Sequence, residues 1–190
     1  RAKDWGAYTS WGRLAACRGL VGITFNHRST HNRTRMADAC GDVEAALAYV
    51  RANAGALGVD PDRLCFWVCS AGGFKLKVVL EHNPAYVRCA VAYYPLLDLP
   101  DSPEVSLIRY VSPQAAPLLL VRAGCDHAVL NAGVDRFVQA ALAQNMHLDL
   151  YNHPAGEHAF DIRNANERSR EIIAHTLDFM VGHLRAHDSQ

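Results

Sequence analysis

The feature that most constrains the fold is a repeated alternation between short apolar runs and longer stretches with helical periodicity. Five runs predict strands: Leu20–Phe25, Leu64–Val68, Cys89–Tyr93, Pro117–Ala123 and His147–Tyr151. The stretches between them predict helices over about 35–53, from Ser70 to about 81, over 132–144 and over 166–187. Strands that alternate with helices form a mainly parallel sheet with helices on both faces. We therefore expect an α/β fold with three layers, α/β/α.

The predicted connections are short, which bears on domain organisation. Gly55 and Gly58 are expected to end the first helix, and Asp60-Pro61-Asp62 to form a turn. No repeat, low-complexity tract or linker interrupts the pattern. We therefore expect residues 1–190 to form a single domain, a usual size for one hydrophobic core.

The balance of charges and the apolar runs exclude several classes of protein. Lys and Arg number 19, as do Asp and Glu, so the net charge is zero, without the basic excess of a nucleic-acid binder. No run of 18 apolar residues predicts a membrane span. The first residues lack the apolar core of a signal peptide, and the six cysteines are predicted to be reduced. A cytoplasmic protein without nucleic-acid or membrane partners is expected, and a homo-oligomer is compatible with this composition.

Cysteines and histidines give little indication of a metal site. The cysteines form no C-x-x-C pair. Among ten histidines, only His27/His31 and His183/His187 have the i,i+4 spacing of ligands on a helix, and neither pair has an obvious third ligand. We expect neither a metal nor a cofactor.

The segment Phe66-Trp-Val-Cys-Ser70-Ala-Gly-Gly73 places a serine at a predicted strand-to-helix turn. Such a turn strains the serine backbone and raises its Oγ above the sheet, where it can act as a nucleophile. The amide of Ala71, at the start of the helix, can then donate to an oxyanion. Two alternatives are an ordinary helix cap for Ser70 and a nucleophilic role for Cys69, which we expect instead to be buried.

An ordered series of motifs along the chain resembles the α/β-hydrolase carboxylesterases, in particular their hormone-sensitive-lipase-like and dienelactone-hydrolase-like branches. The matching motifs are Thr24-Phe-Asn-His-Arg28, Asp42-Val-Glu-Ala-Ala, Val59-Asp-Pro-Asp-Arg-Leu, Ser70-Ala-Gly-Gly, Tyr94-Pro-Leu-Leu-Asp98 and Pro154-Ala-Gly-Glu-His158-Ala-Phe-Asp161. The resemblance implies an α/β-hydrolase fold and a catalytic triad in the chain order serine, acid, histidine.

Within that order, His158 matches the histidine of the family's loop and is the expected base. His153 and His127 are rivals that fit the motif less well. Asp126 follows the fourth predicted strand, where the acid is expected. Asp135 and Asp161 are alternatives for that role.

The sequence departs from the family in two places. Val68 stands two residues before the serine, where the family usually has Gly, and its β-branched side chain is expected to crowd the turn. The family's H-G-G-type loop, which supplies a second oxyanion donor, has no counterpart, so we expect the first strands of the fold to lie upstream of Arg1. Loss of one oxyanion donor typically lowers turnover about 10²–10³-fold.

These observations predict a serine hydrolase that cleaves small carboxylic esters through an acyl-enzyme. A peptidase or lactonase is a second reading, because one fold hosts many substrates. A catalytically impaired binding or scaffold protein is a third, suggested by Val68 and the missing loop.

Overall fold

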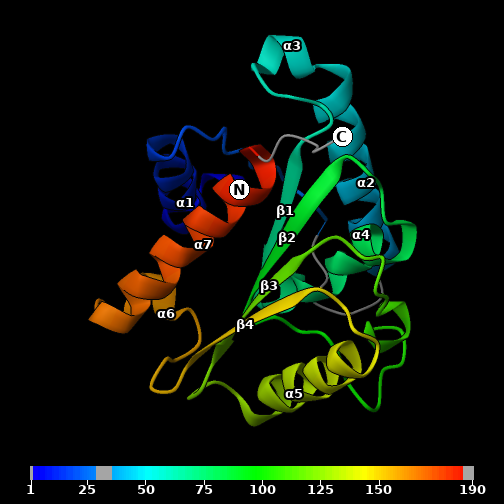
Figure 1. The fold of residues 1–190 in the computed structure, drawn as a ribbon, viewed down its shortest axis with the longest axis vertical. Helices are drawn as coiled ribbons and strands as arrows, with labels where there is room; N and C mark the ends of the chain where they lie inside the picture. The colour runs from blue at the N-terminus through cyan, green and yellow to red at the C-terminus, as the bar shows by residue number, and fades with distance from the viewer. Residues whose placement is uncertain (1, 29–35, 186–190) are drawn as a thin grey trace. The chain divides into compact units, whose positions relative to one another are not determined.

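The computed structural model describes residues 2–28 and 36–185, which fall into two compact units (Figure 1). We call residues 1–63 the N-terminal unit and residues 64–190 the C-terminal unit. The single-domain assignment stays a prediction. Among the described residues, no helix has the length and apolar character needed to cross a bilayer.

The C-terminal unit is built on a four-stranded parallel sheet. Its strands are β1 (Leu64–Cys69), β2 (Val87–Tyr93), β3 (Leu118–Ala123) and β4 (Leu148–His153), side by side in that order. Cys69 pairs with Tyr93, Tyr93 with Val121, and Val121 with Tyr151, so the carboxyl ends of the strands meet at one edge. The loops that leave this edge therefore lie close together, as they do at the sites of open α/β sheets.

Helices cover both faces of this sheet. The helical elements of the unit are η2 (Ser70–Leu76), α4 (Lys77–His82), η3 (Ile108–Tyr110), α5 (Ala128–Ala143), α6 (Phe160–Arg163) and α7 (Glu167–Arg185). Helix α7 lies on one face, and α4 and α5 lie on the other (Figure 1). The α/β architecture with three layers is thus confirmed.

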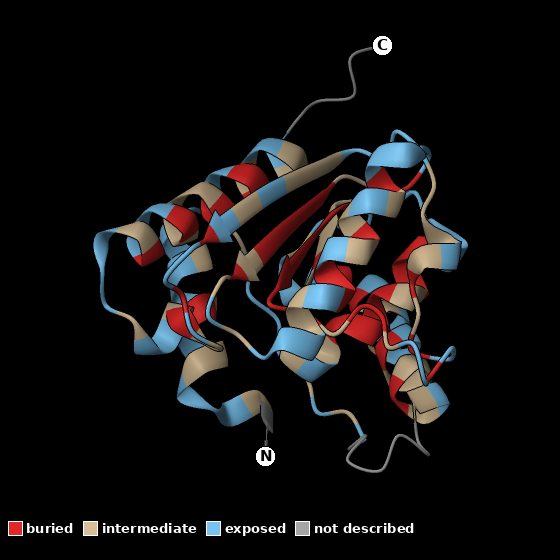
Figure 2. Ribbon diagram, turned by 90° about the horizontal axis from the view of Figure 1, so that it is seen from below, coloured by how far each residue is buried: buried red, intermediate tan, exposed pale blue. Residues whose placement is uncertain are grey.

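Burial follows the position of each strand in the sheet. Every residue of β2 except Arg88 is buried, and so is every residue of β3 except Arg122, because these strands are central. Only His153 is buried in the edge strand β4 (Figure 2). Helix α7 buries one face, with Ile172, Leu177 and Met180 among its buried residues. This apolar core holds the carboxyl edge of the sheet rigid beneath the site.

The N-terminal unit contains η1 (Ala2–Asp4), α1 (Gly6–Cys17), α2 (Met36–Ala52) and α3 (Ala54–Leu57). The helix predicted over 35–53 is confirmed as α2. Gly58 ends α3 with a φ of 67°, a left-handed conformation that favours glycine. Gly55 ends no helix, since it lies inside α3. The predicted turn at Asp60 is confirmed by the Asp62 amide, which donates to the Asp60 carboxylate at 2.9 Å.

Two sequence predictions about regular elements are wrong. Residues 20–25 form no strand, although their composition favours one. A strand needs a neighbouring backbone to accept and donate its ladder bonds, and no strand of the described residues pairs with this run. The helix expected from residue 132 begins four residues earlier, at Ala128, and its first turn holds apolar side chains such as Val129, which is exposed and lies off the buried face.

Candidate active site

The turn from β1 into η2 gives Ser70 the strained backbone that its sequence context predicts. Ser70 has a φ of 52°, in the left-handed region that a non-glycine residue rarely occupies. Its carbonyl accepts a hydrogen bond from the Leu96 amide at 2.8 Å. A Cβ at Gly73 would lie 2.5 Å from the Leu96 carbonyl oxygen, so only glycine allows this close approach. Val68, although buried, does not prevent the turn from forming.

Ser70, His158 and Asp126 form a continuous chain of hydrogen bonds. The Ser70 Oγ lies 2.8 Å from the His158 Nε2. The His158 Nδ1 lies 2.9 Å and 2.8 Å from the two carboxylate oxygens of Asp126. Because a carboxylate only accepts, Nδ1 must carry the proton, and Nε2 is then free to accept the serine hydrogen. The structure therefore brings the three predicted residues together in the arrangement that proton transfer from a serine needs.

Asp126 is held by its own loop and by the loop that carries His158. Its side chain is 1% exposed, and its Oδ1 accepts the His127 amide at 2.6 Å. The Cys125 amide donates to the Gly156 carbonyl at 2.8 Å, which joins the two loops. A Cβ at Gly124 would lie 2.3 Å from the Pro154 carbonyl oxygen, so glycine permits the loops to pass. This packing fixes the separation of the Asp126 carboxylate and the His158 ring.

Ala71 is the second residue of η2 and is exposed. The first amides of a helix have no carbonyl within the helix to accept them, so the Ala71 N–H can donate elsewhere. Cys69, the alternative nucleophile, is the last residue of β1, with extended backbone and a strand partner in Tyr93. It is half-buried, so the expectation of a fully buried thiol is wrong. The strained turn thus falls on Ser70 and not on Cys69.

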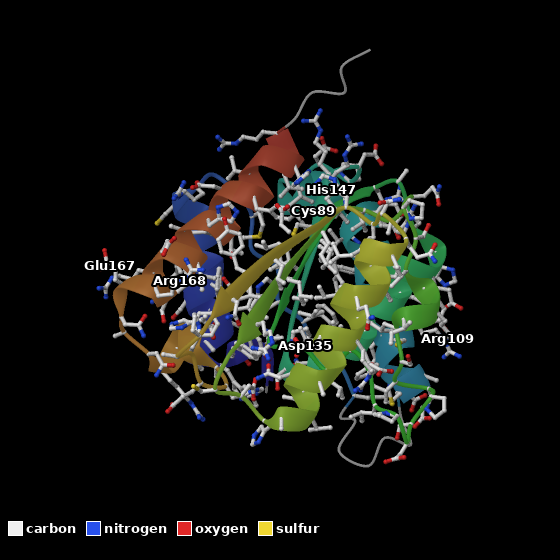
Figure 3. The ribbon with its side chains drawn as sticks, turned by 60° about the horizontal axis from the view of Figure 1, so that its bottom comes forward. Cys89, Arg109, Asp135, His147, Glu167 and Arg168 are labelled. Atoms are coloured by element: carbon white, nitrogen blue, oxygen red, sulfur yellow. The ribbon has the colours of Figure 1, made fainter. Side chains whose placement is uncertain are left out.

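The rival acids have other partners. Asp135 lies on α5 (Figure 3), and its carboxylate accepts from the Arg122 guanidinium at 2.8 Å. Asp161 accepts from the Tyr94 hydroxyl at 2.7 Å. Each carboxylate is therefore engaged by a donor other than the His158 ring.

Of the rival bases, His153 is 2% exposed, and its Nε2 lies 3.1 Å from the Ser169 Oγ and 3.2 Å from the Asn166 Oδ1. His127 is exposed, with its ring centroid 5.9 Å from that of His158. The Ser70 Oγ meets the Nε2 of His158 instead, at 2.8 Å.

Tyr94 lies beside His158, although the sequence indicates it only as the first residue of the Tyr94-Pro-Leu-Leu-Asp98 motif and as an aromatic that lines a pocket or the core. Its ring centroid lies 4.8 Å from that of His158. Burial, followed by the nearby Asp161 carboxylate, raises the pKa of the Tyr94 phenol well above its ordinary value. Its position directly after β2, on the edge that carries Ser70, was the available sequence signal.

No group of three or more potential metal ligands occurs among residues 2–28 and 36–185. His31 and His187, one member of each predicted i,i+4 pair, lie outside the described residues. His183 packs against the rings of His147 and Phe179, and burial lowers its pKa. That environment is typical of a packed histidine.

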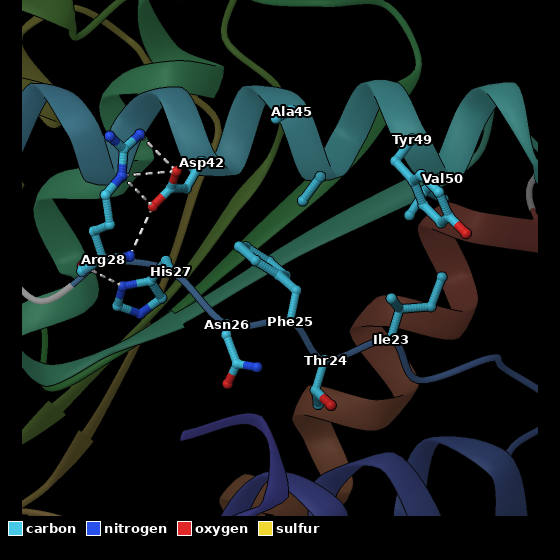
Figure 4. Close-up of a pocket in the computed structure, with 11 residues that line it drawn as sticks. Ile23, Thr24, Phe25, Asn26, His27, Arg28, Asp42, Ala45, Tyr49 and Val50 are labelled. Atoms are coloured by element: carbon cyan, nitrogen blue, oxygen red, sulfur yellow. Dashed lines mark hydrogen bonds and ion pairs between the residues drawn. The ribbon is translucent and has the colours of Figure 1, made fainter. Parts of the chain in front are cut away.

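The N-terminal unit has a hollow of about 690 Å³ between residues 23–28 and α2 (Figure 4). Its lining is mainly apolar, and its strongest charges pair with each other: the Arg28 Nη2 lies 2.7 Å from the Asp42 Oδ1. The Arg28 guanidinium lowers the pKa of Asp42 to about 2. Thr24, the one hydroxyl-bearing side chain of the lining besides Tyr49, donates to the Lys3 carbonyl. The hollow therefore offers no activated nucleophile.

Comparisons with known proteins agree with this fold. Residues 2–80 match the family model BD-FAE. No curated protein matches the chain. Two similar solved structures are an esterase 2 of Thermogutta terrifontis phosphoramylated by tabun, and the propionate-bound thermophilic esterase Est2 of the same organism. The first has a TM-score of 0.79 and 21% identity, over 95% of this chain and 78% of that chain. The second has a TM-score of 0.78 and 19% identity, over 95% and 79%.

The chain shares its fold with this esterase. At these identities the likeness concerns the fold alone. The assignment to the hormone-sensitive-lipase-like or dienelactone-hydrolase-like branch stays a prediction.

Proposed function

We propose that this protein is a serine hydrolase that cleaves small carboxylic esters, with Ser70 as nucleophile, His158 as base and Asp126 as the acid. The observation that carries the proposal is the chain of hydrogen bonds from the Ser70 Oγ through the His158 ring to Asp126. The strained φ of Ser70 supports it independently, because such strain persists mainly where function requires it.

In the proposed reaction, the Ser70 Oγ attacks the ester carbonyl carbon while the His158 Nε2 takes the hydroxyl proton. Asp126 holds the ring by Nδ1 and stabilises the imidazolium that forms. The Ala71 amide donates to the carbonyl oxygen as it becomes an oxyanion. The imidazolium then gives its proton to the departing alcohol, which leaves an acyl group on Ser70. Water, activated by the same ring, releases the acid and restores the serine.

Two further observations support parts of this proposal. The Thermogutta structures include a protein described as an esterase phosphorylated by paraoxon, and this chain shares that protein's fold. All six cysteines are free thiols, which agrees with the proposed cytoplasmic location, where disulfides are rare.

Labelling with a fluorophosphonate tests the proposal. We expect stoichiometric modification of Ser70, located by mass spectrometry of the peptide, together with turnover of p-nitrophenyl acetate or butyrate. The Ser70→Ala variant is the control and should take no label. A folded protein that resists the reagent and hydrolyses no ester would favour the binding or scaffold reading.

A further inference from the structure

Tyr94 occupies a strained position at the same sheet edge as Ser70. It follows β2 directly and has a φ of 38°, in the left-handed region. Its amide donates to the Val121 carbonyl at 2.7 Å, which continues the contact between β2 and β3 by one residue. A strained backbone of this kind persists only where the surrounding structure fixes the residue, because the left-handed conformation costs free energy for a tyrosine.

The strained backbone directs the Tyr94 side chain into the histidine loop. The residue is 5% exposed, and its ring is tilted by 58° against the His158 ring at a centroid distance of 4.8 Å. Its hydroxyl donates to the Asp161 Oδ1 at 2.7 Å. Asp161 lies in the first turn of α6, three positions after His158. One tyrosine thus touches the imidazole with its ring and holds the loop behind it with its hydroxyl.

The loop between His158 and Asp161 turns sharply, so the hydrogen bond from the Tyr94 hydroxyl to Asp161 also restrains the position of the His158 ring. Ala159 has a φ of 64°, a conformation that costs free energy for any residue with a Cβ. The bond from Tyr94 to Asp161 closes this short turn against the end of β2. Hydrogen bonds to a charged acceptor are among the stronger ones in proteins, so the bond resists opening of the turn.

We propose that Tyr94, through its hydrogen bond to Asp161 and its ring contact with His158, is a positioning residue that holds the imidazole in line between Ser70 and Asp126. The inference rests on the proposed function. The hydrogen bonds of the imidazole to Ser70 and Asp126 lie in the plane of the ring, so they do not fix how the ring is tilted. The Tyr94 ring limits that tilt from one side. A displacement of about 1 Å at a reacting group is enough to slow a reaction strongly.

The chain offers a matched control in the preceding residue. Tyr93 is also buried, and its hydroxyl lies 2.7 Å from the Thr176 Oγ1 on α7. Its ring stacks on Phe160 at 5.7 Å. Tyr93→Phe and Tyr94→Phe therefore each remove one hydroxyl from a buried ring, and the hydroxyl bond that the second variant loses is the one to Asp161 in the histidine loop.

The experiment measures kcat and KM for p-nitrophenyl acetate, with thermal midpoints for each variant. We expect Tyr94→Phe to lower kcat about tenfold with KM unchanged within about twofold, the pattern of a lost transition-state interaction. Tyr93→Phe should leave both constants unchanged while lowering the thermal midpoint to a similar extent. Asp161→Ala should lower kcat as much as Tyr94→Phe does, and the variant with both substitutions should lose no more. Asp161→Asn keeps an acceptor oxygen, so it should retain most of the kcat of the unaltered protein. Equal kcat in the two tyrosine variants, or a change confined to KM, would overturn the inference.

A spectroscopic measurement separates this inference from the proposed function. The proton shared by the His158 Nδ1 and Asp126 should give a downfield NMR resonance whether or not esters are hydrolysed. We expect Tyr94→Phe to broaden or shift that resonance and Tyr93→Phe to leave it in place. An unchanged resonance in Tyr94→Phe would overturn the positioning role, and absent ester turnover in the unaltered protein would overturn the hydrolase proposal alone.

Discussion

His158 and His153 lie in the same stretch of chain, and each faces a serine, yet their surroundings differ in two physical respects. The His158 ring has a carboxylate on Nδ1 and is 29% exposed at the side chain. The His153 ring is 2% exposed, and its Nε2 meets the neutral oxygens of Asn166 and Ser169. Asn166 presents an oxygen acceptor, so the His153 Nε2 carries the proton and donates. Its Nδ1 is then an acceptor that has no hydrogen-bond partner among the described residues.

The difference shows what makes a serine–histidine pair suitable for chemistry. A base must become positively charged during the reaction, and only His158 has an anion placed to stabilise that charge. A charged ring at His153 would be buried without a countercharge, which is costly. His153 instead organises the loop: its carbonyl accepts from the amides of Gly124 and Gly156, both at 2.9 Å. The predictions that follow treat the two pairs in parallel.

The largest expected effect comes from deleting the two serine hydroxyls. Ser70→Ala should lower ester turnover on the order of 10⁵–10⁶-fold, because the nucleophile is removed. Ser169→Ala should leave turnover intact and lower the free energy of unfolding by about 1–2 kcal/mol, because a buried histidine loses a partner. Steady-state assays and urea unfolding of both variants measure these outcomes. Substantial ester turnover in Ser70→Ala would contradict Ser70 as the nucleophile and would favour Cys69.

The second prediction compares the partners of the two histidines. Asp126→Asn should lower kcat about 10⁴-fold, because an amide no longer fixes the required tautomer or stabilises the imidazolium. Asn166→Ala should leave kcat unchanged. It should lower stability by about 0.5–2 kcal/mol, since the Asn166 Oδ1 caps α7 by accepting the Ser169 amide at 2.8 Å. Similar kcat losses in both variants would mean that the two histidines are not functionally distinct.

The third prediction concerns the pH dependence of turnover. Catalysis requires a neutral imidazole that accepts the serine proton, so kcat/KM should rise across the range in which histidine loses its proton, about pH 5–8. His153→Leu should leave the shape of this profile unchanged, because its ring takes no part in proton transfer. The profile is measured with an ester whose acylation step limits the rate. A flat profile would argue against His158 as the base.

The sequence predicts most of the sheet, because strands follow local apolar patterns. The expected site residues Ser70, Asp126 and His158 rest also on the family resemblance, and the structure places them within hydrogen-bond distance of one another. The runs that became β1 to β4 are apolar and short, and the turn at Ser70 has small residues where a tight turn needs them. The absence of a strand at residues 20–25 could not be predicted from the sequence, because a strand needs a pairing partner and the partner can lie far away in the chain. Only coordinates bring the Tyr94 hydroxyl to Asp161, since 67 residues separate them in the sequence.

The smallest expected effect concerns the tyrosines beside the two histidines. Tyr94 contacts the His158 ring, and Tyr93 stacks on Phe160, which in turn packs on the His153 ring at 4.9 Å. Burial raises the pKa of both phenols well above the ordinary value of about 10.

The two phenols should therefore make the fold sensitive to alkali. A group whose pKa is raised by folding contributes stability that is fully present below its unfolded pKa and is lost as pH rises above it. Above about pH 10 each buried phenol should lower the free energy of unfolding by up to about 1.4 kcal/mol per pH unit. Tyr93→Phe and Tyr94→Phe should each flatten this decline by a similar amount, measured by urea unfolding at several alkaline pH values. Phenolate absorbance gives an independent check: Tyr93 and Tyr94 should ionise only as the protein unfolds. Ionisation of Tyr94 in the folded protein near pH 10, the ordinary pKa of tyrosine, would show that its hydroxyl is open to solvent, contrary to the burial of this residue.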